Sequence, residues 1–259
     1  MIESNRIYNM DCVEGMRELP DKSIDCVICD LPYGTTACSW DSVIPFDKLW
    51  EQYERICKDT AAIVLFGSEP FSSDLRLSNR KLYKYDWYWN KSKQGNFAQA
   101  PYMPLKNIET ISVFSKGNIA PNSAVKMIYN PQGTIPCNKI NNGGNKANAF
   151  RPNRSEKDAD HIQTMTNYPR QLLTFDSSYQ FIHPTQKPED LIRYLVRTYS
   201  NPGDTILDNC MGSGTTAVAA VLEKRKFIGF ETDATYFEKA NERLRKLTGP
   251  FRIYGNIGV

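Results

Sequence analysis

The chain reads TILDNCMGSGTTAVAAVLEKRKFIGFE from Thr205 to Glu231. Residues 205–207 form a short apolar run typical of a buried strand, and the turn that follows is rich in glycine. An Ala- and Val-rich stretch typical of a helix comes next, and residues 227–230 form a second apolar run that ends at Glu231. This order predicts a strand–helix–strand unit whose turn approaches a nucleoside and whose final carboxylate accepts hydrogen bonds from ribose hydroxyls.

The glycine-rich turn is not specific by itself. The Gly-x-Gly-x-x-Gly pattern of dinucleotide-binding folds lacks its third glycine here, because Gly212 and Gly214 are followed by Thr215 and Thr216. The alternative interpretation is a tight connection from strand to helix that holds no ligand. Other parts of the chain must decide between the two.

The segments before and after this unit repeat the alternation of strand and helix. Residues 24–29 form a nearly continuous apolar run, which predicts a strand covered on both faces, and the run ends at Asp30. Apolar residues recur at helical spacing over 46–56, ahead of another buried run over 61–66. The same patterns predict a short helix over 11–19, strands over 85–89 and 111–114, and helices from Pro188 and over 235–247. The predicted fold class is therefore α/β, with a mostly parallel, doubly wound sheet.

Periodicity fades over residues 117–175, where Asn, Gly, Pro and basic residues dominate. We expect one large domain with two halves, residues 1–116 and 176–259, and an insertion over 117–175 between them. The net charge of +3 is small, but the excess of Lys and Arg over Asp and Glu is concentrated in the insertion. A solvated surface loop is the alternative interpretation of this region.

The composition excludes several classes of protein. No apolar run approaches the roughly 18 residues that a membrane span needs, and the N-terminus has no secretory signal pattern, so a cytoplasmic protein without a membrane role is expected. The seven cysteines are an odd, scattered set that fits reduced thiols. Cys26 and Cys29 form a C-x-x-C pattern, but residues three apart in a strand point to opposite faces, so no metal site is predicted.

Three short motifs occur in a fixed order. They are Asp30-Leu31-Pro32-Tyr33, His183-Pro184-Thr185-Gln186-Lys187-Pro188, and the segment from Asp208 to Thr216. In this order, and with each motif at the end of a predicted strand or the start of a predicted helix, the chain resembles the β class of amino-methylating DNA methyltransferases, the N6-adenine/N4-cytosine family of Asp-Pro-Pro-Tyr type. The resemblance spans almost the whole chain. It implies a Rossmann-like, S-adenosylmethionine-dependent methyltransferase fold, with a catalytic first half, a target-recognition insertion and a cofactor-binding second half.

The resemblance also implies a mechanism. The lone pair of adenine N6 is delocalised into the ring, so this amine is a poor nucleophile. By similarity to the family, the Asp30 carboxylate and the backbone carbonyl of Leu31 or Pro32 accept hydrogen bonds from the amino group and free its lone pair for attack on the methyl group. Tyr33 would stack on the flipped base. The chain departs from the family at Leu31, where proline is usual, and at Asn209-Cys210, where Pro-Phe is common; neither change removes a side chain that does chemistry.

The binding residues follow from the same resemblance. S-adenosylmethionine is the implied cofactor and double-stranded DNA the implied partner. The predicted cofactor-binding residues are Asp11, Cys12, His183, Thr185, Lys187, Asp208, Met211, Gly212, Ser213, Gly214, Thr215 and Glu231. The predicted DNA-binding residues are Lys139, Lys146, Arg151 and Arg154, all in the insertion. Glu231 is expected to hold the ribose of the cofactor, and Asp208 to line its methionine side.

The same motifs bear on other functions that the chain could have. A cytosine C5-methyltransferase needs a Pro-Cys nucleophile, and Pro136-Cys137 is such a dipeptide, but it lies in the insertion and not at a strand end. Protein and RNA amino-methyltransferases generally place the cofactor turn before the catalytic motif, whereas here it follows. A non-catalytic DNA-binding protein would be expected to lose Asp30 or Tyr33, and a nicotinamide oxidoreductase to have the third glycine. Within the class, Asp at the first motif position favours adenine, with N4 of cytosine as the alternative; a homodimer and a partner restriction endonuclease stay open.

The predicted role of the insertion is testable by removing its charge. Replacing Lys139, Lys146, Arg151 and Arg154 together by Ala should weaken binding to duplex DNA, because Lys and Arg on phosphates release counterions on binding. The slope of log Kd against log salt should flatten by about 0.9 for each lost phosphate contact, while cofactor affinity stays unchanged. Unaltered DNA affinity, salt slope and site preference would show that the insertion is only a solvated loop.

Overall fold

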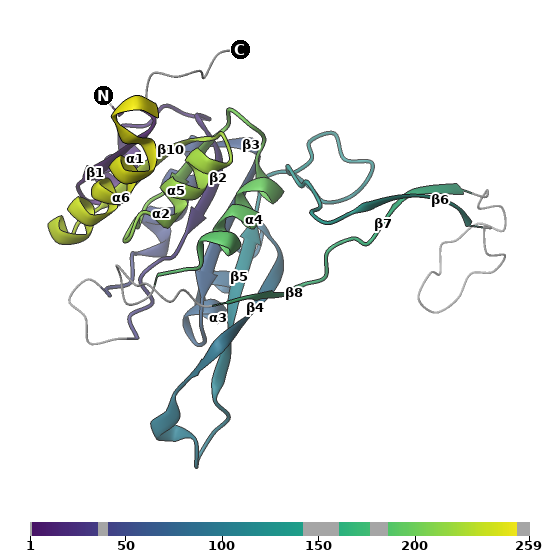
Figure 1. Ribbon diagram of the computed structural model, residues 1–259, viewed down its shortest axis with the longest axis horizontal. Coiled ribbons are helices and arrows are strands. Elements are labelled where there is room, and N and C mark those ends of the chain that lie inside the picture. Colours follow the sequence, from purple (N-terminus) through teal and green to yellow (C-terminus); the bar gives the residue numbers. More distant parts are fainter. Residues whose placement is uncertain (1, 36–40, 142–160, 177–185, 253–259) are drawn as a thin grey trace. The chain divides into compact units, whose positions relative to one another are not determined.

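A computed structural model describes residues 2–35, 41–141, 161–176 and 186–252 (Figure 1). Its contacts divide the chain into two units, one made of Met1–Asn130 with Gln171–Val259 and the other of Pro131–Arg170. The larger unit carries an eight-stranded sheet and the smaller one a two-stranded ribbon. The smaller unit falls within the range 117–175 expected as an insertion, and its role in target recognition stays a prediction.

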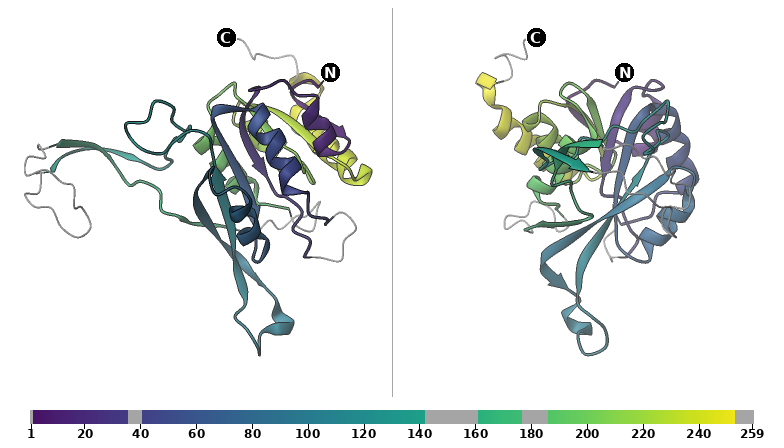
Figure 2. Two further views of the ribbon diagram at one scale, coloured as in Figure 1. Left: turned by 180° about the vertical axis from the view of Figure 1, so that it is seen from behind. Right: turned by 90° about the vertical axis from the view of Figure 1, so that its right-hand side faces the viewer.

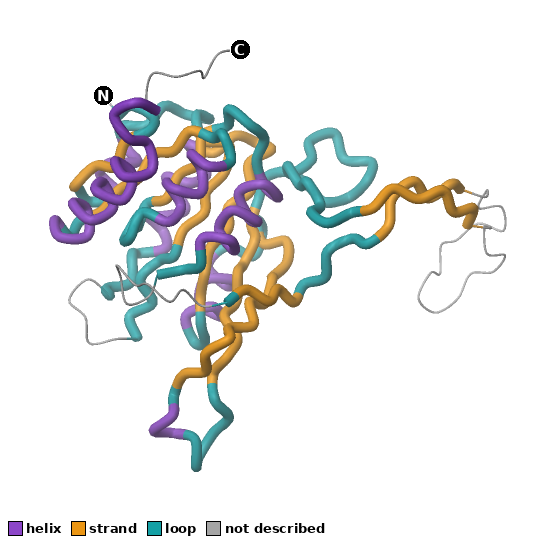
Figure 3. Tube along the Cα trace, viewed as in Figure 1, coloured by secondary structure: helices purple, strands orange, loops and turns teal. Residues whose placement is uncertain are grey.

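The larger unit alternates strands and helices along most of its length (Figure 3). Its first part contains β1 (Arg6–Asn9), α1 (Cys12–Arg17), β2 (Ile24–Cys29), α2 (Phe46–Ile56), β3 (Cys57–Gly67), α3 (Phe71–Ser78), β4 (Tyr83–Gly95), the short 3-10 helix η1 (Phe97–Gln99) and β5 (Lys106–Phe114). Its second part contains β8 (Leu172–Phe175), α4 (Glu189–Tyr199), β9 (Thr205–Asp208), α5 (Thr215–Leu222), β10 (Lys226–Glu231) and α6 (Ala234–Arg252).

The strands form one mostly parallel sheet in the order β1-β10-β9-β2-β3-β5-β4-β8, in which only β5 runs against its neighbours. The predicted Rossmann-like α/β fold is therefore confirmed. Two strands of this sheet, β1 and β8, had no counterpart among the sequence predictions. In β1 only Ile7 is buried, and in β8 only Leu173 is buried, so neither segment carries the apolar pattern by which a strand is recognised. Because β8 pairs with β4, the end of the range expected as an insertion belongs to the large sheet.

Helices cover both faces of the sheet (Figures 1 and 2). Apolar residues of α4, α5 and α6 pack into one core cluster, and those of α1, α2 and α3 into another. β2 shows how the sequence divides between the two: Cys26 and Ile28 belong to the first cluster, Val27 and Cys29 to the second. The C-x-x-C pair therefore points to opposite faces, as strand alternation predicts. All six residues of β2 are buried, which explains its unbroken apolar run.

The connections reverse direction between β2 and β9. From β2 the chain passes through α2, on one face, to β3; from β9 it passes through α5, on the other face, to β10. β2 and β9 pair directly in parallel, with Cys26 opposite Ile206 and Val27 opposite Leu207. In doubly wound sheets ligands bind outside the carboxyl ends of the strands at such a switch point. The fold thus places a site where β2 and β9 end.

The smaller unit consists of β6 (Ile135–Asn141) and β7 (His161–Thr166), paired antiparallel. The sequence did not predict these strands, because their apolar residues, including Ile140 and Ile162, are exposed and show no buried face. Cys137 lies in this ribbon, which belongs to the smaller unit. In the described part of the chain, every helix is too short or too polar to cross a bilayer.

Candidate functional site

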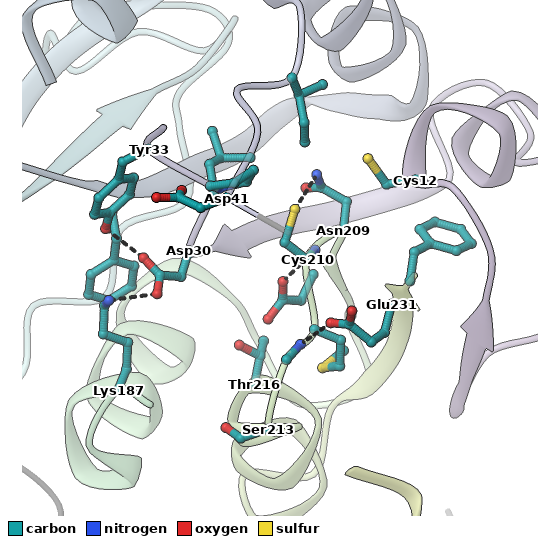
Figure 4. Close-up of a pocket in the computed structure, with 18 of the residues that line it drawn as sticks. Cys12, Asp30, Tyr33, Asp41, Lys187, Asn209, Cys210, Ser213, Thr216 and Glu231 are labelled. Atoms are coloured by element: carbon teal, nitrogen blue, oxygen red, sulfur yellow. Dashed lines mark hydrogen bonds and ion pairs between the residues drawn. The ribbon is translucent and has the colours of Figure 1, made fainter. Parts of the chain in front are cut away.

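A cavity of about 830 Å³ opens at the carboxyl ends of the parallel strands (Figure 4). Asp30 and Tyr33, from the segment after β2, line it together with Asp208 and the turn after β9. Glu231, at the end of β10, completes the wall on the side away from Tyr33. Motifs that are far apart in the sequence therefore line one cavity. One of its walls follows β2, and the other is formed at the ends of β9 and β10.

The turn between β9 and α5 has the backbone shape that its glycines allow. Gly214 precedes the first residue of α5 with a φ of 76°, in the left-handed region that other residues rarely adopt. Met211, Gly212, Ser213 and Thr215 all line the cavity. Backbone N–H groups at the start of a helix attract anionic groups, so this turn suits the carboxylate end of an amino acid.

Glu231 is held by the backbone on both sides of its side chain. The N–H of Gly212 donates to Oε2 at 2.7 Å, and the N–H of Asp233 donates to Oε1 at 2.9 Å. Burial raises the pKa of Glu231, and these backbone donors oppose the rise. A carboxylate offers about four acceptor positions, so each oxygen can still accept a hydrogen bond from a hydroxyl group. The predicted ribose-binding residue is thus preset in orientation and keeps free acceptor capacity.

Asp208 lies deeper in the cavity wall, with 4% of its surface exposed. Its Oδ1 accepts a hydrogen bond from the backbone N–H of Cys210 at 3.1 Å. Burial raises the pKa of Asp208 to about 6. Next to it, Asn209 accepts a hydrogen bond from Tyr53 on α2 at 2.5 Å, which fastens the turn to a helix on the opposite face of the sheet.

Asp11 has a structural task in addition to its place in the wall. Its Oδ1 accepts from the backbone N–H groups of Val13 and Glu14 at 2.9 and 3.1 Å and so caps α1. Asp11 and Cys12 both line the cavity, and Cys12 lies on the same side of it as Glu231 (Figure 4). Cys12 is buried, and its thiol pKa is raised by its hydrogen bond with Cys210 and by burial, so it is not a reactive nucleophile.

The catalytic motif presents its carboxylate in a fixed position. Asp30 directly follows β2, and its Oδ1 accepts a hydrogen bond from the Tyr33 hydroxyl at 2.5 Å. The Tyr33 ring stacks on Phe71 of α3, with the centroids 5.0 Å apart. Asp41, which also lines the cavity, supports this segment, because its two carboxylate oxygens accept from the backbone N–H groups of Gly34 and Thr35 at 2.8 and 2.9 Å.

Lys187 lies against this carboxylate and not against the glycine-rich turn. Its Nζ donates to Asp30 Oδ2 at 2.6 Å and lies 3.3 Å from Glu109 Oε2, while Glu109 Oε1 accepts from Lys91 at 2.9 Å. Two carboxylates and two ammonium groups thus alternate along a chain of contacts. Sequence reasoning expected Lys187 beside the cofactor and missed Glu109 and Lys91, because their proximity depends on β4 and β5 lying near the start of α4.

The charges in this network stabilise one another's ionised forms. Burial raises the pKa of Asp30, and the charge of Lys187 opposes this rise. Burial lowers the pKa of Lys187, but Asp30 and Glu109 outweigh burial and hold it above its ordinary value. Burial likewise raises the pKa of Glu109, but Lys187 and Lys91 outweigh it and hold the pKa below its ordinary value. Lys187 therefore stays protonated and favours an ionised Asp30.

The described cavity wall does not include every predicted site residue. His183, Thr185, Lys146, Arg151 and Arg154 fall outside the described residues. Lys139 lies on β6 in the smaller unit and is exposed. Leu31, Pro32 and the remaining predicted cofactor residues belong to the larger unit. Of the described candidates, only Gly214 and Lys139 are absent from the cavity wall.

Known proteins resemble the chain over nearly its whole length. A family model described as DNA methylase, for N6 and N4 enzymes, matches residues 24–242. The Type II methyltransferase M1.MboII of Moraxella bovis is 27% identical over 261 residues, covering 95% of this chain and 99% of the relative. The DNA adenine methyltransferase YhdJ of Escherichia coli K12 is 25% identical over 256 residues, covering 93% and 83%. The structure of the PvuII DNA methyltransferase, described as cytosine-N4-specific, matches with a TM-score of 0.64 at 16% identity, covering 96% and 91%.

Proposed function

The chain belongs to the N6/N4 family of DNA methylases, and from this premise we propose that it transfers a methyl group to the exocyclic N6 of adenine in double-stranded DNA. The class predicted from the sequence, an amino-methylating DNA methyltransferase, is confirmed by this membership, and so is S-adenosylmethionine as the methyl donor of the family. A homodimer and a partner endonuclease stay predictions.

The residues of one cavity wall fit this cofactor. The backbone N–H groups of the turn suit a carboxylate, the free acceptor positions of Glu231 suit ribose hydroxyls, and the buried carboxylate of Asp208 suits a positively charged ligand. The cavity of about 830 Å³ lies within the range of ligand pockets in proteins. When bound, the cofactor supplies an electrophilic methyl group on a cationic sulfur.

The observation that carries the proposal is the position of the Asp30 carboxylate in the same cavity as the glycine-rich turn. Each of its oxygens accepts one hydrogen bond, from Tyr33 or from Lys187, and keeps one further acceptor position. A base amino group can donate one N–H to Asp30 and the other to a backbone carbonyl of Leu31 or Pro32. Both interactions draw the nitrogen lone pair out of conjugation and strengthen as positive charge develops on nitrogen.

Tyr33 and Lys187 act on this carboxylate from opposite sides. The Tyr33 hydroxyl fixes its rotation, while the ring, stacked on Phe71, offers an aromatic surface for a base turned out of the duplex. Lys187 maintains the charge, because a neutral Asp30 accepts hydrogen bonds more weakly. We therefore assign Lys187 as a positioning residue for Asp30.

Adenine is favoured over cytosine by the residue at the first motif position, Asp30. The relative YhdJ is named a DNA adenine methyltransferase, which supports the same base. N4 of cytosine is the second candidate, because the fold is shared with an enzyme described as cytosine-N4-specific. The fold therefore does not discriminate between the bases, and the proposal rests on the motif.

The base is identified by its product. Duplex DNA is methylated with radiolabelled S-adenosylmethionine and digested to nucleosides. The label should then appear in N6-methyl-2′-deoxyadenosine. Label in N4-methyl-2′-deoxycytidine would instead support cytosine as the target base. An unlabelled digest would reject both adenine and cytosine. Sequencing that reports modified bases, applied to DNA from cells expressing the protein, gives the recognition site in the same experiment.

Mutations in the two walls of the cavity should affect turnover and cofactor affinity separately. Asp30→Ala should lower turnover by more than tenfold, about 1.4 kcal/mol in the barrier, while the Kd for S-adenosylmethionine stays near that of the wild type. Glu231→Ala should weaken cofactor binding, because the ribose hydroxyls lose their acceptor. Calorimetric titration and turnover at saturating cofactor measure the two effects independently. An Asp30→Ala enzyme with more than about a tenth of wild-type turnover would contradict the assigned role.

The role of Lys187 should be visible in the pH profile. Lys187→Met removes the charge that opposes burial, so the pKa of Asp30 should rise further. Asp30 works as an anion, so the loss of kcat/KM on the acidic side should set in at higher pH than in the wild type. Lys91→Met is the matched control, since Lys91 contacts Glu109 and not Asp30, and its acidic limb should stay near that of the wild type. Coincident acidic limbs for Lys187→Met and the wild type would reject the assignment.

A further inference from the structure

The β4–β5 hairpin extends beyond the sheet that it belongs to (Figures 1 and 2). β3 pairs with β5 only as far as Gly67 opposite Thr110, and β8 pairs with β4 only as far as Lys91 opposite Phe175. Among the described residues, the hairpin from Ser92 to Asn107 has strand pairing only within itself, where Gly95 lies opposite Lys106. We refer to residues 92–107 as the arm.

The arm projects from the same edge of the sheet as the cavity. β4 runs parallel to β2 and β3, because each of β3 and β4 pairs antiparallel with β5. Its carboxyl end therefore points in the direction in which β2 ends at Asp30. The base of the arm lines the cavity itself, through Lys93, Gln94 and Gly95. A duplex whose base enters the cavity must pass beside this segment.

The side chains of the arm combine positive charge with exposed aromatic rings. Phe97 is 66% exposed and Tyr102 is 89% exposed, in a segment with no apolar core of its own. Lys93 and Lys106 are exposed near its base. From Trp87 to Ile108 the sequence contains no Asp or Glu, so the charged side chains of the arm, Lys93 and Lys106, are both positive. Large exposed aromatic residues on a protruding segment indicate a contact surface.

This chemistry matches DNA better than a protein surface. Lysines without intervening carboxylates complement phosphates, and aromatic rings stack on bases of any sequence. A second copy of the chain would bring another positive arm against this one. We propose that the arm contacts the DNA duplex, an inference that rests on the proposed function. Lys93 and Lys106 neutralise phosphates beside the target, and Phe97 and Tyr102 pack against the bases that neighbour the extruded one.

The proposed contact between the arm and DNA offsets part of the free energy that base extrusion costs. Extruding a base costs a few kcal/mol of pairing and stacking, and apolar side chains placed at the disrupted step replace part of the lost stacking. The arm therefore favours the extruded state, whereas Asp30 and Tyr33 act on the base after it has entered the cavity. This division predicts different effects on duplex and on single-stranded substrates.

The aromatic contact is tested with a Phe97→Ala/Tyr102→Ala variant. Its Kd for a fluorescein-labelled 30-base-pair duplex containing the methylated site should rise by about tenfold or more. The loss should be smaller for a duplex with a mismatch at the target, where unpairing is already partly supplied. Leu77→Ala/Ile119→Ala is the matched control, because both residues are exposed apolar side chains outside the arm, and it should bind like the wild type. Cofactor affinity and melting temperature should be unchanged in both variants.

The charge contact is tested with Lys93→Ala/Lys106→Ala on a random-sequence 30-base-pair duplex. The slope of log Kd against log salt should flatten by up to about 1.8, for two phosphate contacts at about 0.9 each. Lys81→Ala/Lys226→Ala is the control; these exposed lysines lie beside the amino ends of β4 and β10, at the opposite edge of the sheet, and their removal should leave the slope unchanged.

The outcomes separate this inference from the proposed function. If the wild type methylates DNA and both arm variants bind duplexes with unaltered Kd and salt slope, the arm is not a DNA contact although the function stands. If Phe97→Ala/Tyr102→Ala instead changes the oligomeric state in sedimentation and leaves DNA binding unaltered, the arm contacts a second copy and the inference is wrong. Absence of methyl transfer to DNA by the wild type would reject the proposed function, while the salt slope on random-sequence DNA would still test the arm.

Discussion

The parallel pairing of β2 with β9 is the constraint on which the site depends. These strands are separated by most of the chain, yet Cys26 lies opposite Ile206 and Val27 opposite Leu207. This register places Asp30, directly after β2, and Asp208, the last residue of β9, at the same edge of the sheet. Since the helices that follow them leave on opposite faces, the space between the strand ends stays open. A donor on the β9 side and an amine on the β2 side can meet there in a fixed geometry.

The site holds more buried charge than stability alone would favour. Burial raises the pKa of Asp30, Asp208 and Glu231, so the surroundings of all three penalise the ionised form. Backbone donors reduce this penalty at Glu231, and the ammonium of Lys187 reduces it at Asp30. The cofactor wall thus relies on dipoles and the catalytic wall on a full charge. This difference suits a wall that binds a cationic ligand and a wall that must attract developing positive charge on an amine.

The same fold carries proteins described as acting on adenine and on cytosine, so its strands and helices supply the geometry of transfer and leave the choice of base to local groups. In this chain the candidate groups for contact with DNA lie outside the doubly wound core, on the arm between β4 and β5 and on the smaller unit. Segments that need not bury a core can vary in sequence without disturbing the register of β2 and β9.

The sequence by itself determined the elements whose signals are local. The apolar runs of β2 and β9, the glycine turn and the helix after Pro188 could be recognised because buried strands and helix starts follow from neighbouring residues. Asp30, Asp208 and Glu231 were found because each lies at the end of such a strand or directly after it. The tertiary structure alone decided the pairing of β8 with β4, the contact of Lys187 with Asp30 and Glu109, and the projection of the arm. Each of these depends on which strands become neighbours across long loops, and the free energy of that pairing is not encoded in any short stretch of residues.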